Sequence, residues 1–128
     1  MKKETKVQMP VVGDKYSKYY FMIEEIDGVP TVTLKRSVLT VTDSVGQHTV
    51  RYHEKFEDGR ESVNLRAVRD GHPWEDAVIV SPRGVSVICK GNKTKAKKLV
   101  AAYYAEQRKK HEKALARIEL NAFLVKGA

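Results

Sequence analysis

Cysteine, long apolar runs and acidic residues in the C-terminal third are what this sequence has least of. Cys89 is the one cysteine among 128 residues, so no disulfide forms within the chain, and this content suits a reducing compartment. No stretch approaches the ~20 apolar residues that a membrane-spanning helix needs. The basic start of the chain is not followed by the apolar run of a signal peptide. We therefore expect a cytoplasmic protein with no membrane partner.

Motifs of catalysis and of metal binding are also missing. The four histidines have no i, i+4 partner and no cysteine ligand set that would hold zinc. No glycine-rich phosphate loop and no nucleophile elbow occurs. His53 and Glu54 are neighbours on one expected strand, so alternation directs them to opposite faces. The acids of the loop 70–76 lack a typical ligand spacing. We expect no enzyme activity, no metal and no cofactor.

What the sequence does contain is typical of one folded domain. Its 128 residues, 41% hydrophobic and 31% charged, are enough to bury one core. Residues 1–15 are polar and basic, and we expect a loosely ordered arm. Residues 16–90 alternate short β-prone runs with tight turns, which predicts a sheet. Residues 93–126 follow a helical period.

The first expected hairpin turns at Asp27-Gly28, a pair typical of two-residue type I′ turns. This turn places Ile23 opposite Val32 and Phe21 opposite Leu34. The apolar residues of the following strand change parity after Arg36, which predicts a bulge near residues 36–37.

Two further turns set the expected register of the next strands. A turn over Ser44–Gln47 places Val41 opposite Val50 and Leu39 opposite Tyr52. A two-residue turn at Asp58-Gly59 then places Tyr52 opposite Leu65. The same register sets Arg51 opposite Arg66, a like-charge pair that favours an anion lying over it. The expected secondary basic face consists of Arg51, His53, Lys55 and Arg66, and its alternative is an ordinary solvated sheet face.

A last hairpin over residues 77–90 turns at Ser81–Gly84, with Val80 opposite Val85 and Val78 opposite Val87. Five to six short antiparallel strands with tight turns predict an α+β protein. We expect a β-meander that curls into a small SH3-like or OB-like barrel, followed by a long amphipathic basic helix. No motif ties the chain to a named family.

The helix carries the charge imbalance of the whole chain. Residues 90–117 hold ten Lys or Arg against Glu106 and Glu112, a difference of +8 that equals the net charge of the chain. At about 100° per residue, Val100, Tyr103, Leu115 and Ile118 share one apolar arc with other apolar residues, so we expect the helix to lie along the barrel. Asn92 or Thr94 is expected to cap its start.

A neutral body with a basic helix favours a polyanion partner. Lysines in the first turn oppose the helix dipole, and free N–H groups there would suit a phosphate. Lysine supplies point charge rather than a planar fork, so we expect backbone contacts with little sequence preference, to DNA or RNA. The expected nucleic-acid-binding residues are Lys90, Lys93, Lys95, Lys97, Lys98, Arg108, Lys109, Lys110, Lys113 and Arg117.

Trp74 leaves two interpretations open. It is either a stacking platform or partner anchor, or a core residue that covers the end of the barrel. The alternative function is that of a protein-interaction module, a small regulator or inhibitor that docks on an acidic protein partner. Phe123 and Leu124, which fall off the apolar arc, are the second observation that supports this alternative.

Overall fold

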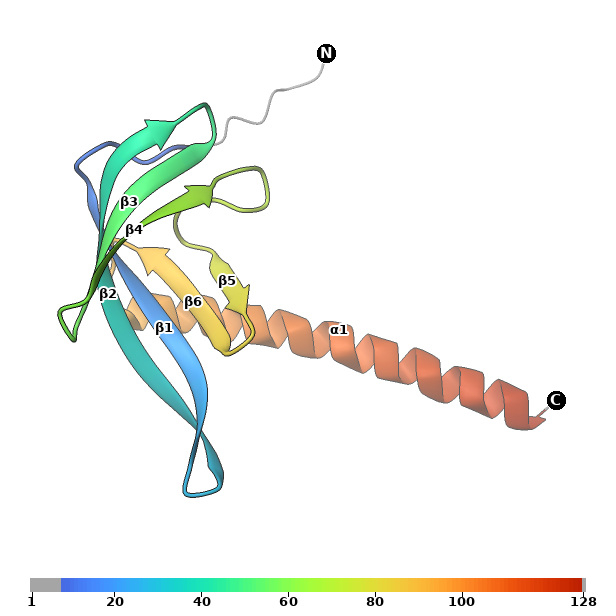
Figure 1. Ribbon diagram of the computed structural model, residues 1–128. Helices are drawn as coiled ribbons and strands as arrows, with labels where there is room; N and C mark the ends of the chain where they lie inside the picture. Colours follow the sequence, from blue (N-terminus) through green and yellow to red (C-terminus); the bar gives the residue numbers. More distant parts are fainter. Residues whose placement is uncertain (1–7, 128) are drawn as a thin grey trace, which may run out of the picture.

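The computed structural model describes residues 8–127 and contains six strands and one helix (Figure 1). The α+β class, the antiparallel sheet and the single C-terminal helix are confirmed. The elements are β1 (Lys15–Ile26), β2 (Val29–Val45), β3 (Thr49–Phe56), β4 (Glu61–Ala67), β5 (Val78–Ser81), β6 (Gly84–Cys89) and α1 (Lys93–Gly127).

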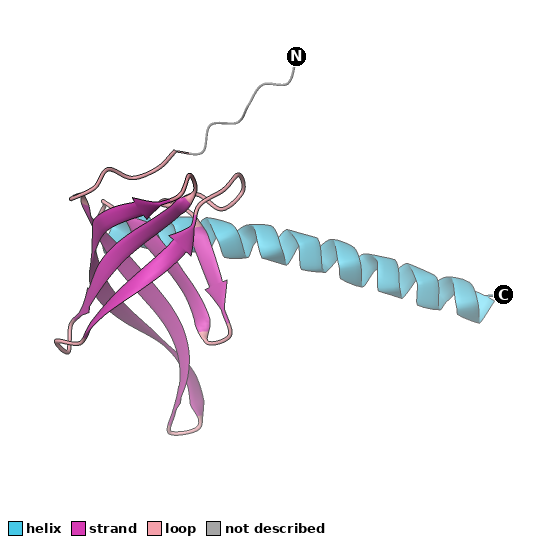
Figure 2. Cartoon of the chain, turned by 45° about the horizontal axis from the view of Figure 1, so that its top comes forward, coloured by secondary structure: helices cyan, strands magenta, loops and turns pink. Residues whose placement is uncertain are grey.

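The sheet is a curled half-barrel in which the strand order is β4-β3-β2-β1-β6-β5. The first four strands form a meander, and the chain then crosses from β4 to the far side of β1, where β6 pairs with β1. Strands β4 and β5 therefore form the two edges, and Figure 2 shows the sheet curving between them. The concave face encloses one core, and the convex face receives the helix.

The first hairpin has the predicted register, with Ile23 opposite Val32 and Phe21 opposite Leu34. Asp27 and Gly28 take φ values of 53° and 78°, as a type I′ turn requires. The expected bulge near residues 36–37 is wrong, because pairing of β1 with β2 runs unbroken from Thr40 to the turn. The apolar parity changes for another reason: β2 turns its apolar residues to the convex face near the hairpin tip and to the concave face farther on.

The register between β2 and β3 differs from the prediction by two residues. Val41 lies opposite Tyr52 instead of Val50, and a bulge sits between Val41 and Asp43. The turn is a three-residue loop over 46–48 rather than a turn over 44–47. A shift of two keeps each side chain on its predicted face, so the apolar residues of both strands are buried as expected.

The register between β3 and β4 differs by one residue, which turns β4 over. The hydrogen bond from Phe56 N to Arg60 O, at 2.8 Å, closes a three-residue loop over 57–59 just before β4 begins. The Asp58 side chain stabilises this loop by accepting from Arg60 N at 3.0 Å. Consequently Arg51 faces Leu65 and not Arg66, and Arg66 faces Val50.

The last hairpin has the predicted pairing of Val80 with Val85 and Val78 with Val87.

The sheet has one hydrophobic core on each of its faces. The concave core is built from Tyr16, Leu39, Val41, Val50, Tyr52, Val68, Trp74 and Ile88. The convex core is built from Tyr19, Val85, Val87, Cys89, Ala96 and Val100, the last two from α1. Cys89 is a buried free thiol.

Helix α1 packs on the sheet only through its first four turns. Ala96 and Val100 are buried, and Gln107 is the last half-buried side chain. Residues 108–126 are all exposed, and Figure 1 shows this part of the helix leaving the sheet behind. The expectation that the whole helix lies along the barrel is therefore wrong for this segment, which we call the free half of α1 (residues 108–126).

The segment before β1 is held by the sheet as far as the structure describes it. Gly13 N donates to Val41 O at 2.8 Å, and Met9 packs against the concave core. For residues 8–14 this contradicts the expected loose arm; the same expectation for residues 1–7 lies outside the described residues. Among residues 8–127, no helix has the length and apolar character that crossing a bilayer requires.

Candidate nucleic-acid interface

The first turn of α1 is capped by Asn92. Its Oδ1 accepts from the backbone N–H of Thr94 at 3.1 Å and of Lys95 at 3.3 Å. The carbonyl of Asn92 also accepts from Ala96 N at 3.3 Å. Three of the N–H groups at the helix start are therefore engaged within the chain. The cap therefore reduces the number of backbone donors that the first turn can offer to a phosphate and leaves the lysine side chains as the main ones.

Two of the expected cations at this end are already paired with carboxylates. Lys90 Nζ lies 3.0 Å from Asp14 Oδ2, and Lys95 Nζ lies 3.2 Å from Asp76 Oδ2. The hydrogen bond to Asp14 raises the pKa of Lys90 above its ordinary value. These lysines tie the helix start to the sheet, so they offer less charge to a ligand.

Two more cations pair along the helix itself. Arg108 Nε lies 3.3 Å from Glu112, and Lys110 Nζ lies 3.7 Å from Glu106. Both pairs are exposed, and each stabilises a helix only by a few tenths of a kcal/mol, so a polyanion would displace them easily.

The remaining six predicted cations make no ion pair with any carboxylate in the part of the chain that the structure describes. They are Lys93, Lys97, Lys98, Lys109, Lys113 and Arg117, all exposed. At about 100° per residue, Lys98, Lys109 and Lys113 fall on one side of the helix, opposite the face that packs on the sheet. We call these three residues the lysine band. At ~1.5 Å per residue it extends over about 22 Å of helix.

The secondary basic face does not exist as predicted. Arg51, His53 and Lys55 lie on the convex side of β3, and the one-residue register change puts Arg66 on the concave side. Arg51 Nη1 lies 3.5 Å from Asp43, and His53 Nε2 lies 3.7 Å from Glu61. The like-charge pair that favoured an anion is absent, because Arg51 and Arg66 are on opposite faces.

Trp74 is a core residue, which decides between its two interpretations. It is 2% exposed, and its ring makes edge-to-face contacts with Tyr16 at 5.6 Å and Tyr52 at 5.3 Å between centroids. A ring enclosed in this way offers no face to a base. The predicted stacking or anchoring role is therefore wrong.

A buried polar cluster on the concave face was not predicted. Glu54, 3% exposed, accepts hydrogen bonds from the hydroxyls of Tyr20 and Ser37 and from the Asn64 amide, the last two at 2.6 and 3.3 Å. Burial lowers the pKa of nearby Lys18, against the opposing influence of Glu54. The alternation of β3 contained the signal, since Glu54 shares parity with the core residue Tyr52. Three donors hold this carboxylate, which is the arrangement of a structural group rather than of a free base.

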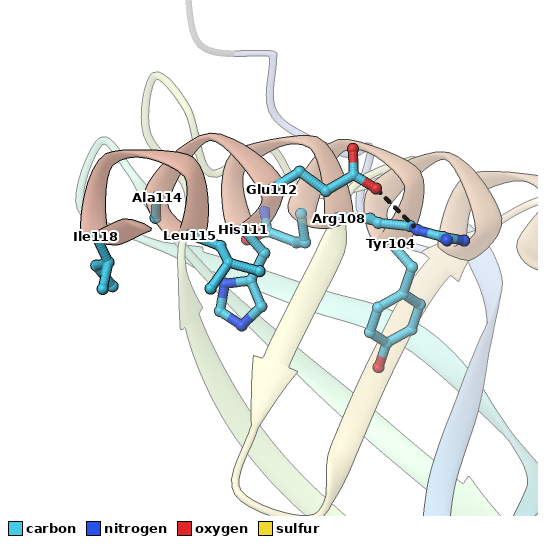
Figure 3. A pocket seen from close by; sticks show the side chains of 8 residues that line it. Tyr104, Arg108, His111, Glu112, Ala114, Leu115 and Ile118 are labelled. Carbon is cyan, nitrogen blue, oxygen red and sulfur yellow. Dashed lines mark hydrogen bonds and ion pairs between the residues drawn. The ribbon is translucent and has the colours of Figure 1, made fainter. Parts of the chain in front are cut away.

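A shallow hollow of about 750 Å³ lies on one side of the helix (Figure 3). Tyr104, His111, Leu115 and Ile118 point to this side, and the paired Arg108 and Glu112 border it. All of its lining residues come from α1. The lysine band and this hollow lie on different sides of the same helix.

No group of three or more His, Cys, Asp or Glu side chains is arranged to hold a metal within residues 8–127. Comparisons with protein-family models, with curated proteins and with solved structures give no match.

Proposed function

We propose that this protein binds nucleic acid through the phosphate backbone and that α1 makes the contact. The lysine band is the observation that supports this function most directly, because its three ammonium groups are exposed and unpaired within the described chain. The region after residue 89 carries the whole net charge of +8, so the electrostatic potential around these lysines is positive and attracts a polyanion.

Binding by such a band is dominated by charge. Lysine ammonium groups contact phosphates without reading base edges, so we expect similar affinity for different sequences. If six cations meet phosphates, affinity falls by about 10³ between ~50 and ~200 mM salt.

The test is a salt titration with a 20-base-pair duplex, a 20-nucleotide single strand and an RNA of the same length. The triple variant Lys98→Glu, Lys109→Glu and Lys113→Glu should bind at least tenfold more weakly at 100 mM salt. The slope of log affinity against log salt should become shallower by roughly 2 to 3.

The matched control is the triple variant Lys15→Glu, Lys35→Glu and Lys55→Glu, which changes the net charge equally on exposed positions of the sheet. It should retain most of the affinity. An equal loss in both variants would show that net charge and not the band governs binding. No detectable binding by the wild-type protein at 50 mM salt would refute the function.

Docking on an acidic protein partner is the second candidate. The exposed apolar residues of the free half favour it, because a phosphate backbone would leave them uncovered. They include Leu115, Ile118 and Phe123, which are 56%, 64% and 71% exposed. A pull-down from nuclease-treated lysate tests this function, which loses its support if every enriched species disappears with nuclease.

A further inference from the structure

The chain leaves two apolar surfaces uncovered, and the first lies on the β1–β2 hairpin. Phe21, Ile23, Val32 and Leu34 share its convex face, in the cross-strand pairs Phe21–Leu34 and Ile23–Val32. Ile23 and Val32 are 59% and 64% exposed. We call these four residues the hairpin face. A two-stranded ribbon of this kind is about 10 Å wide, which matches the diameter of one helix.

The second uncovered surface is the hollow on α1. Tyr104, Leu115 and Ile118 form its apolar wall, as Figure 3 shows, and each is at least 47% exposed. Exposed apolar area of this size on a helix that leaves its own sheet is characteristic of a binding surface.

The two surfaces resemble a contact that already exists within the chain. The first turns of α1 cover Tyr19, Val87 and Cys89 on the convex side of the sheet. The hairpin face continues this convex side, since Phe21 pairs with Val85 and also packs against the same core. The first turns of α1 therefore show how a helix covers the convex side of the sheet, whereas the neighbouring hairpin face has no helix over it.

The free half of α1 cannot reach the hairpin of its own chain. Figures 1 and 2 show the hairpin tip and the end of the helix leaving the body in different directions. A continuous helix without a proline does not fold back on itself. A helix that packs on the hairpin face must therefore come from a second molecule.

Charge makes a second copy of this chain the fitting partner. On the convex face and the turn of this hairpin, residues 21–34 contribute Glu25 and Asp27 and no Lys or Arg, a formal charge of −2. Glu24 lies on the concave face, where Lys35 Nζ is 3.5 Å away. Lys109 and Lys113 of the lysine band face away from the hollow. The rest of residues 104–126 contains four Lys or Arg and three Glu, a formal charge of +1. Two helix ends facing each other would bring like charges together, whereas helix on hairpin joins opposite charges.

We propose that two copies of this chain associate by placing the free half of α1 of each copy on the hairpin face of the other. The apolar wall of the hollow, from Tyr104 to Ile118, spans about 21 Å, and strand β1 from Phe21 to its end spans about 20 Å, so the two surfaces have similar lengths. A standard interface buries ~800 Å² per partner, and in this arrangement each chain contributes both of its apolar surfaces. The lysine band faces away from this contact and stays available.

The test is the oligomeric state of nuclease-treated protein, measured by sedimentation velocity from 5 to 200 µM. The wild type should be a dimer. Val32→Lys on the hairpin face and Ile118→Lys on the helix should each weaken association at least tenfold. Val63→Lys is the matched control, because Val63 is also 64% exposed on the convex side, but on β4. Ala105→Lys, on an exposed position beside the lysine band, is the control for the helix.

Mixing the two interface variants separates the proposed contact from helix-on-helix pairing. The Val32→Lys chain keeps its helix and the Ile118→Lys chain keeps its hairpin face, so a mixture should form a mixed dimer through one restored contact. A monomeric wild type at 200 µM would overturn the proposal, and so would a Val32→Lys variant that remains a dimer. Circular dichroism identifies a variant that fails to fold, and Ile23→Lys or Leu115→Lys then replaces it. The Lys98, Lys109 and Lys113 triple variant should remain a dimer, so this test is independent of nucleic-acid binding.

Discussion

Single residues on the concave face link stability to pH. Burial raises the pKa of Tyr16, Tyr20 and Tyr52, and the hydrogen bond from Tyr20 to Glu54 raises the pKa of Tyr20 further. The folded protein therefore keeps these phenols protonated at a pH at which an unfolded tyrosine, with a pKa of 10.0, loses its proton.

We expect the free energy of unfolding to fall as pH rises above about 10, because only the unfolded state then releases these protons. Burial lowers the pKa of Lys18, which has the opposite effect up to pH 10.5, but one lysine opposes three phenols. Urea unfolding at pH 8.0 and 10.7 measures the difference. Tyr20→Phe should lose less stability over this interval than the wild type, and an equal loss would contradict the assignment.

Gly84 occupies a position with no room for a side chain. A Cβ there would overlap the carbonyl oxygen of Phe21 and lie 3.1 Å from Met22 Cα, both backbone atoms that cannot move aside. We expect Gly84→Ala to destabilise the protein by about 3 kcal/mol or more, because β6 must separate from β1. Gly91→Ala is the control: its Cβ would meet only the flexible Lys95 side chain. Chemical denaturation of both variants should show a small effect for Gly91→Ala.

At the scale of elements, the start of α1 depends on one cap. Asn92→Ala removes the acceptor of two backbone N–H groups and should cost about 1 kcal/mol. Thr94→Ala leaves this acceptor in place and should cost less than half as much. Thermal unfolding followed at 222 nm distinguishes the two, and equal losses would mean that the cap is shared.

The pairing register of a hairpin was predicted correctly only where the sequence also indicated the correct turn length. Asp27-Gly28 accepts one turn type, so the register of the first hairpin followed directly. Asp58-Gly59 fits a two-residue turn and also a three-residue loop in which Asp58 caps the Arg60 N–H, and the structure has the second. This choice depends on whether Asn64 and Arg66 or Val63 and Leu65 face the core. Long-range contacts such as that of Asn64 with Glu54 are not visible in local pattern.

The sequence predicted which residues of the candidate interface are basic, but not which of them form ion pairs within the chain. The helix and its cations follow from charge and period, which are local properties. The engagement of Lys90 and Lys95 does not, since their partners Asp14 and Asp76 come from other parts of the chain. The apolar arc correctly indicated that the helix packs on the sheet, although it could not show that the sheet covers only the first turns.

At the scale of the whole molecule, we expect the fold not to depend on the free half of α1, because its side chains are all exposed. A chain that ends at Gln107 keeps Ala96 and Val100 on the convex core, and all of the side chains that it loses from residues 108–126 are exposed. We expect its free energy of unfolding in urea to lie within about 1 kcal/mol of that of the full-length Ile118→Lys chain, in which the proposed dimer contact is also weakened. A chain that ends at Cys89 is the comparison, and it should be much less stable because it uncovers Val87 and Tyr19. A large loss from the first truncation would show that the free half packs on the body.

Because α1 is continuous from its docked first turns to its last residue, its length fixes both the distance of its end from the sheet and the direction in which each side chain points. Each residue added between positions 107 and 108 would move the end by about 1.5 Å and rotate it by about 100°. Inserting seven residues would extend the reach by about 10 Å and nearly restore the direction of Leu115 and Ile118. Inserting two would extend it by only about 3 Å and turn these residues to the far side. Whatever α1 holds is therefore set at a fixed distance and a fixed angle from the half-barrel.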